Sequence, residues 1–177
     1  MKTKCFDAFQ VSLQQVRQKV AIFDALLLKL LLAYTVTLLE VYLQDLVQGL
    51  ISGDTGLMLK LAESKYFQSH KISLASAIKS DPKHYLQALV KDINFHNLSD
   101  VEPLLRQAFN IKITITSELV ELIKLRNDIA HRNGCNKAGQ SLVVSSADMT
   151  QSINAIASLV QQVDEQAVLA YGHIVNL

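Results

Sequence analysis

Apolar residues recur at helical spacing along most of the chain, and the pattern is clearest over residues 22–50. One stripe of mostly aliphatic side chains there repeats every three or four residues, as expected of a helix that buries one face. Its members are Leu32, Val36, Leu39, Leu43, Leu46 and Leu50. We therefore predict a long helix over residues 22–50, preceded by an amphipathic helix over residues 6–20 and followed by a turn at Gly53 and Gly56.

The middle of the chain is less regular and predicts shorter helices. Two short helices are expected over residues 57–63 and 73–79. Another is expected to start at residues 81–82, because Asp caps a helix and Pro fits its first turn. The Ser-Asp-Val-Glu sequence at residues 99–102 matches a capping box, which predicts a helix from there to about residue 109.

In the second half of the chain, apolar and polar residues alternate over a short stretch, and a long helix follows at the end. Residues 111–116 and 141–146 are short enough to be extended connections. A final helix is predicted over residues 148–174. Many helical segments and only two prolines favour an all-α bundle, and the lack of a linker favours a single domain over residues 1–177.

Composition limits the class of protein. The formal net charge of +1 argues against a large surface for polyanions. Cys5 and Cys135 form no disulfide framework and have no zinc-ligand spacing. The N-terminus lacks the apolar core of a signal peptide, so a reducing, cytoplasmic location is expected. The most apolar stretch contains Asp24 and Lys29, which favours a buried or dimer-facing helix over a membrane span.

A charged side chain on an apolar helix face is the strongest anomaly in the sequence. Thr116 or Ser117 is expected to cap a helix that ends near Arg132, with Asn133-Gly134 as its left-handed stop. Its apolar arc consists of Leu119, Leu122, Ile123, Leu125, Ile129 and Ala130. Arg126 falls in the middle of this arc. Burying an unpaired guanidinium is costly, so a carboxylate, a second subunit or a bound anion is expected to meet it.

Two further polar residues accompany this arginine. Asn127 and His131 lie four residues apart along the edge of the apolar arc. Arg126-Asn127, three residues, and then His131 resembles the signature of the HEPN superfamily, in which four to six residues separate Arg from His. The surrounding residues 122–139, with Ile-Ala-His-Arg-Asn-Gly before a second Gly, resemble the RiboL-PSP-HEPN branch.

The resemblance reaches both ends of the chain. Residues 38–46 are similar to the long second helix of that branch, and the final helix also matches. No family landmark is visible over residues 51–110. The resemblance implies a HEPN-like helical bundle with two long N-terminal helices, a motif helix and a long C-terminal helix. It also implies a homodimer in which the motif helices face each other.

The implied activity is metal-independent cleavage of RNA by an endoribonuclease of the toxin–antitoxin, phage-defence or RNA-processing type. The products would be a 2′,3′-cyclic phosphate and a 5′-hydroxyl, with no cofactor. Under this reading Arg126 stabilises the phosphorane, His131 transfers protons, and Asn127 orients the imidazole or holds a phosphate oxygen.

Supporting roles are assigned to two other residues. Glu40 could pair with Arg126 and position it, or it could be an ordinary surface carboxylate. Arg132 could contact the RNA backbone, or it could be a solvated helix end. The remaining histidines, namely His70, His84, His96 and His173, are expected at the surface. Tyr34 and Tyr42 are expected to pack rather than stack on bases.

Two other functions compete with the nuclease. A non-catalytic HEPN module could dimerise or act with a nucleotidyltransferase or a defence effector, whereas an active toxin could be held inactive by an antitoxin. A plain helical adaptor could hold Arg126 in an internal salt bridge. A metal enzyme is disfavoured, because the sequence has neither the carboxylate–histidine cluster of a di-iron bundle nor a Gly-rich phosphate loop.

Overall fold

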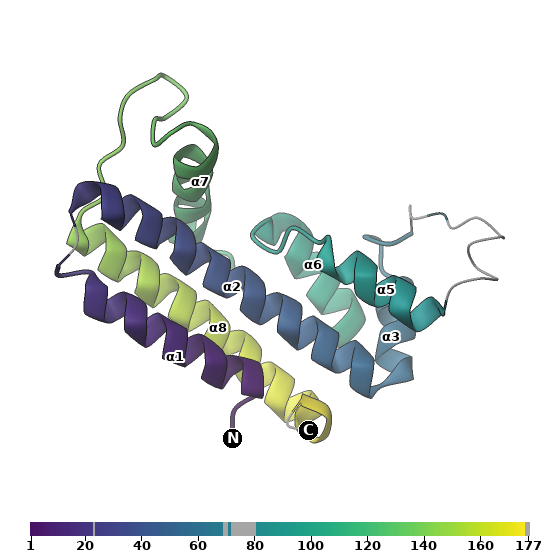
Figure 1. Cartoon of the computed structure of the whole chain (residues 1–177). Coiled ribbons are helices and arrows are strands. Elements are labelled where there is room, and N and C mark those ends of the chain that lie inside the picture. Colours follow the sequence, from purple (N-terminus) through teal and green to yellow (C-terminus); the bar gives the residue numbers. More distant parts are fainter. Residues whose placement is uncertain (23, 69–70, 72–80, 176–177) are drawn as a thin grey trace.

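Long helices lying side by side make up most of the structure, a computed structural model that describes residues 1–22, 24–68, 71 and 81–175. The helices are α1 (Lys4–Lys19), α2 (Ala25–Gly53), α3 (Thr55–Ala62), α5 (Pro82–Lys91), α6 (Leu98–Phe109), α7 (Ser117–His131) and α8 (Ser146–Val175). Figure 1 shows α1, α2 and α8 running together, with α3, α5 and α6 grouped around the end of α2. Helix α7 projects near the beginning of α2.

Helix α2 is the element on which the others pack, since it contacts α1, α3, α5, α7 and α8. Asp24 starts it by accepting hydrogen bonds from the amides of Leu26 and Leu27 at 3.0 and 2.9 Å. By length and composition alone α2 could cross a membrane, and half of its most apolar window is buried inside the bundle. Packing by five other helices is the arrangement of a core helix.

The all-α prediction is confirmed, and most helix boundaries fall within a few residues of those expected. Asp81 caps α5 through the amide of Lys83, and Thr116 caps α7 through the amide of Leu119. After α7, Asn133 and Gly134 have φ values of 52° and 73°, which is the predicted left-handed stop. The helix expected over residues 73–79 lies outside the described residues.

The predicted capping box is wrong. Asn97 is the N-cap of α6, so Ser99 lies inside the first turn and donates a hydrogen bond to the Asn97 side chain instead. A capping-box pattern fixes only the local spacing, whereas the fold decides where the chain turns into the helix.

The two expected extended segments form no strand in the described parts of the chain, where one isolated bridge joins Cys135 and Ser141. The alternation over residues 111–116 instead reflects packing on the core, because Ile111 and Ile113 are buried. The side chain of Gln166 forms the hydrogen bonds that a partner strand would supply: it accepts one from the amide of Lys112 and donates one to the carbonyl of Lys112.

A buried carboxylate ties the N-terminus to the final helix. Asp164, on α8, is fully buried and accepts hydrogen bonds from the amide and hydroxyl of Thr3 and from the hydroxyl of Tyr42. Tyr42 is buried, as expected of a packing residue, and burial is the main cause of its raised pKa. Burial also raises the pKa of the nearby Cys5 thiol to about 11, so this thiol stays protonated at neutral pH.

Replacing Asp164 with Ala is expected to lower the free energy of unfolding by about 1–3 kcal/mol, because buried donors lose their acceptor. Urea unfolding followed by circular dichroism measures this change. Glu165→Ala is the matched control, because Glu165 is the exposed neighbour on the same helix and should change stability little. Equal stability of the two variants would contradict a structural role for Asp164.

Candidate active site

Helix α7 leaves the core partway along its length. Leu119 and Leu122 in its first half are buried against the bundle, whereas Ile123, Leu125 and Ile129 are only partly covered. The helix packs on α2 and α8. Arg126 therefore lies where the apolar face of the helix passes from the core toward solvent.

Arg126 is held by two partners in the same chain. Its side chain is 17 % exposed, and its Nη2 atom lies 3.8 Å from Glu40 Oε2, on α2. Its Nη1 atom donates a hydrogen bond to Asn127 Oδ1 at 3.1 Å. Of the partners expected for this guanidinium, a carboxylate is thus present. A separation of 3.8 Å is an ion pair rather than a hydrogen bond, so donors of Arg126 remain available to an anion.

Glu40 also contacts a histidine that the sequence did not single out. The second carboxylate oxygen of Glu40, Oε1, forms a short hydrogen bond or ion pair with His96 Nδ1. Their side chains are 22 % and 13 % exposed, respectively, so the prediction that His96 is a surface residue is wrong. Glu40 therefore connects Arg126 on α7 with His96 in the loop between α5 and α6.

The loop residues around His96 explain why it turns inward. Ile93 and Phe95 are buried just before it, and Leu98 is buried just after it. Its carbonyl accepts a hydrogen bond from the amide of Leu98 at 2.9 Å. No local pattern could have indicated the contact, because 56 positions separate His96 from Glu40.

The other motif residues lie at the exposed end of α7. Asn127 is half-buried beside Arg126, and His131 is the last residue of the helix and is exposed. Arg132 pairs with Asp128 one turn earlier. The arrangement offers a fixed cation, an amide and a solvent-accessible imidazole along one helix.

The remaining histidines do not join this group. His84 is exposed and pairs with Asp81 at 3.0 Å, and His173 is exposed on α8. His70 lies outside the described residues. In the part of the chain that the structure describes, no three His, Cys, Asp or Glu side chains are placed to hold a metal ion.

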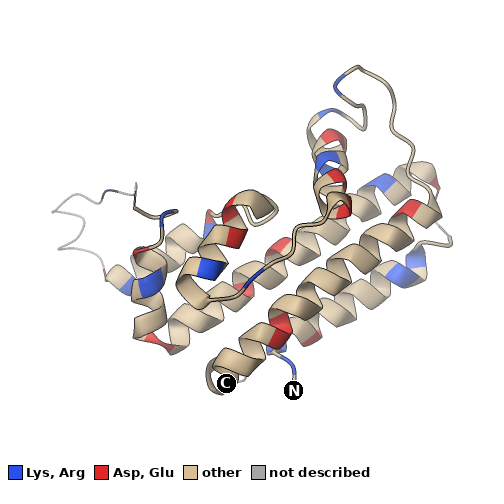
Figure 2. Cartoon of the chain, turned by 180° about the vertical axis from the view of Figure 1, so that it is seen from behind, with Lys and Arg blue, Asp and Glu red and all other residues tan. Residues whose placement is uncertain are grey.

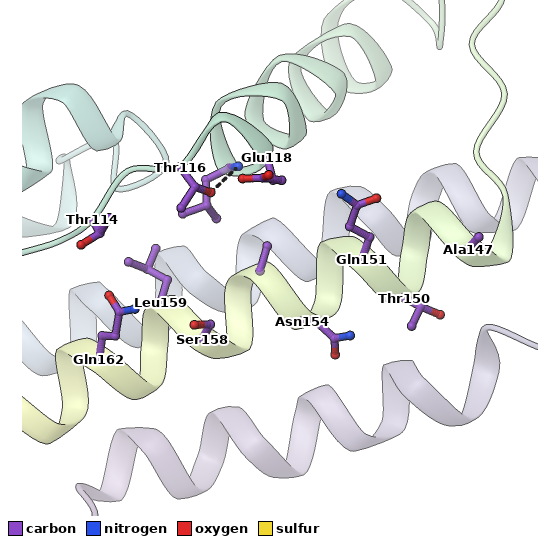
Figure 3. A pocket seen from close by; sticks show the side chains of 12 residues that line it. Thr114, Thr116, Glu118, Ala147, Thr150, Gln151, Asn154, Ser158, Leu159 and Gln162 are labelled. Carbon is purple, nitrogen blue, oxygen red and sulfur yellow. Dashed lines mark hydrogen bonds between the residues drawn. The ribbon is translucent and has the colours of Figure 1, made fainter.

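A separate groove lies between the beginning of α7 and α8, and it contains none of the motif residues (Figure 3). Uncharged polar side chains such as Thr150, Asn154 and Gln162 line much of it, together with Glu118. It supplies neither a cation nor an imidazole, so it is not the site that the motif indicates.

Comparison with known proteins supports the resemblance seen in the sequence. A family model described as RiboL-PSP-HEPN matches residues 7–168, which includes Glu40, His96 and the whole motif helix. No curated protein and no solved structure matches the chain. The match spans well over half of the sequence, and we conclude that the chain belongs to the RiboL-PSP-HEPN family.

Proposed function

We propose that this protein is a metal-independent endoribonuclease that acts as a homodimer. The observation that carries the proposal is the placement of Arg126, held by Glu40 and Asn127 on the same helix as the exposed His131, which follows five residues later. A guanidinium with donors available to an anion, on the same helix as an imidazole open to solvent, suits phosphodiester chemistry.

The proposed reaction needs two proton transfers. The ribose 2′-oxygen attacks phosphorus as one imidazole accepts its proton, and the bond from phosphorus to the 5′-oxygen breaks as a second imidazole donates a proton. The products are a 2′,3′-cyclic phosphate and a 5′-hydroxyl. His131 from each of two copies fills these roles, and Arg126 stabilises the negative oxygens of the phosphorane.

An exposed apolar stripe on α2 supports the proposal that a second copy of the chain binds there. Leu26, Leu30, Tyr34 and Val41 are 46–65 % exposed and recur at spacings of four, four and seven residues. At about 100° per residue, Glu40 lies between this stripe and the buried face of α2. A second copy seated on the stripe would bury Tyr34, which is exposed in the single chain despite its expected packing role, and would bring two motif helices near each other.

Glu40 and His96 act in this proposal as positioning residues. Glu40 fixes the guanidinium of Arg126, and His96 fixes the carboxylate of Glu40 from the opposite side. Neither needs to touch RNA. Their effect on the rate comes from keeping Arg126 where charge develops in the transition state.

A non-catalytic adaptor is the second candidate, because an internal salt bridge to Arg126 is what a purely structural role requires. In that case a nucleotidyltransferase or defence effector would bind the same dimer. The variants below separate the two functions.

Purified wild type incubated with total cellular RNA in EDTA is expected to give fragments with cyclic-phosphate ends. His131→Ala is expected to lower the rate at least about a hundredfold, because the reaction loses its proton-transfer group. His173→Ala, at an exposed position on α8, is the matched control and should cleave normally. Equal cleavage by His131→Ala and wild type, or cleavage that requires added metal, would contradict the proposed mechanism.

Replacing His96 with Ala is expected to lower kcat about tenfold, with little change in KM, because Arg126 becomes less well positioned. His96→Asn should restore most of the rate, since its amide can donate to Glu40 from a position close to that of Nδ1. Melting temperatures check that both variants fold. A role that is only structural would show no such rescue at matched stability.

Leu30→Glu is expected to convert a dimer into a monomer and abolish cleavage, because it places a charge in the apolar stripe. Sedimentation velocity and the RNA assay measure the two effects. Val11→Glu, at an exposed apolar position on α1, is the control and should remain dimeric and active. A monomeric wild type that cleaves RNA would overturn the composite cleft.

A further inference from the structure

A groove of about 640 Å³ runs beside the outer end of α7, and the motif residue Asn127 is part of its lining. Its lining consists of Lys124, Asn127, Asp128, Arg132, Asn136, Lys137 and Ala138. One wall is α7 itself, and the other is the loop that follows it. Asn127 belongs both to this groove and to the hydrogen bond with Arg126, so the groove adjoins the candidate active site.

The loop wall is an ordered hairpin rather than an open connection. The side-chain oxygen of Asn136 accepts hydrogen bonds from the amides of Ala138 and Gln140 at 2.9 and 3.0 Å. The amide of Asn136 donates to the carbonyl of Gln140 at 2.9 Å, and Gly139 supplies a φ of 79° at the turn. These bonds hold Lys137 in place opposite α7.

Cations are concentrated around this groove. Three of its seven lining residues are Lys or Arg, compared with 17 in the 177 residues of the chain. Asp128 is the opposing charge in the lining, and it pairs with Arg132. Lys29, from α2, adds a further cation at the base of the hairpin. Its ammonium group packs directly beside Gly134, where any side chain would touch it.

The other side of α7 has the opposite charge. A second groove between α7 and α8, which shares Glu118 with the one in Figure 3, includes Glu118, Glu121 and Asp148 in its lining and has no Lys or Arg there. Figure 2 shows both basic and acidic positions toward the far end of α7, a basic position on the following loop, and acidic positions nearer the start of the helix. A polyanion approaching α7 is therefore attracted to the hairpin side and repelled from the α8 side.

We propose that this groove binds the sugar–phosphate backbone of single-stranded RNA beside the phosphodiester that is cleaved. The inference rests on the proposed function and adds the direction from which the RNA enters. Lys124 and Lys137, on opposite walls, contact phosphates, and the side-chain nitrogen of Asn127 contacts a phosphate or ribose oxygen. The lining has no aromatic ring, so binding depends on the backbone rather than on base stacking.

The test measures binding separately from cleavage. A fluorescein-labelled, 15-nucleotide single-stranded RNA of mixed sequence is titrated in EDTA with the His131→Ala protein, and anisotropy gives Kd between 50 and 200 mM NaCl. Lys124→Gln and Lys137→Gln, each added to this background, are expected to raise Kd about three- to tenfold. Each should reduce the slope of log Kd against log salt by about 0.7, the value for one single-strand phosphate contact.

Lys60→Gln, an exposed position on α3, is the matched control and should leave Kd and the slope unchanged. If Lys124→Gln and Lys137→Gln bind RNA as tightly as this control, the groove proposal is overturned, even where wild type cleaves RNA. If wild type cleaves no RNA while these variants still weaken salt-dependent binding, the groove proposal stands and the nuclease proposal fails.

Discussion

The carboxylate of Glu40 joins three parts of the fold that are far apart in the sequence. Its two oxygens face Arg126 on α7 and His96 in the loop before α6, and Glu40 itself lies on the central helix α2. A cation in the middle of an apolar helix face is unfavourable without such a partner. The ion pair therefore lets α7 pack on α2 while a guanidinium stays near the surface. The position of Arg126 in the motif depends on this ion pair.

Around this contact the surface divides into regions with different physical character. An apolar stripe on α2 lies on one side of Glu40, and a cationic groove follows the outer end of α7. The acidic groove toward α8 completes the division. The proposed dimer surface and the proposed RNA groove share no residue, so neither proposal excludes the other. The net charge of the chain is near neutral because positive and negative residues nearly cancel in the total, so it gives no indication of this local separation.

Local patterns predicted the helices well, because helical periodicity, caps and stops act over only a few residues. The start of α5 at Asp81-Pro82 and the end of α7 at Asn133-Gly134 follow from such signals. The capping box at residues 99–102 failed because the signal is equally short, and Asn97 began the helix two residues earlier. Apolar and polar residues do alternate over residues 111–116, but two of the apolar ones are buried against the core and the segment forms no strand.

The sequence alone determined the all-α class, the position of the motif helix and the need of Arg126 for a partner, because each follows from neighbouring residues and the cost of burying charge. Only the tertiary structure decided that Glu40 meets this need, that His96 faces Glu40, and that Lys124 and Lys137 line one groove. These contacts join residues brought together by packing on α2, and no spacing along the chain encodes them.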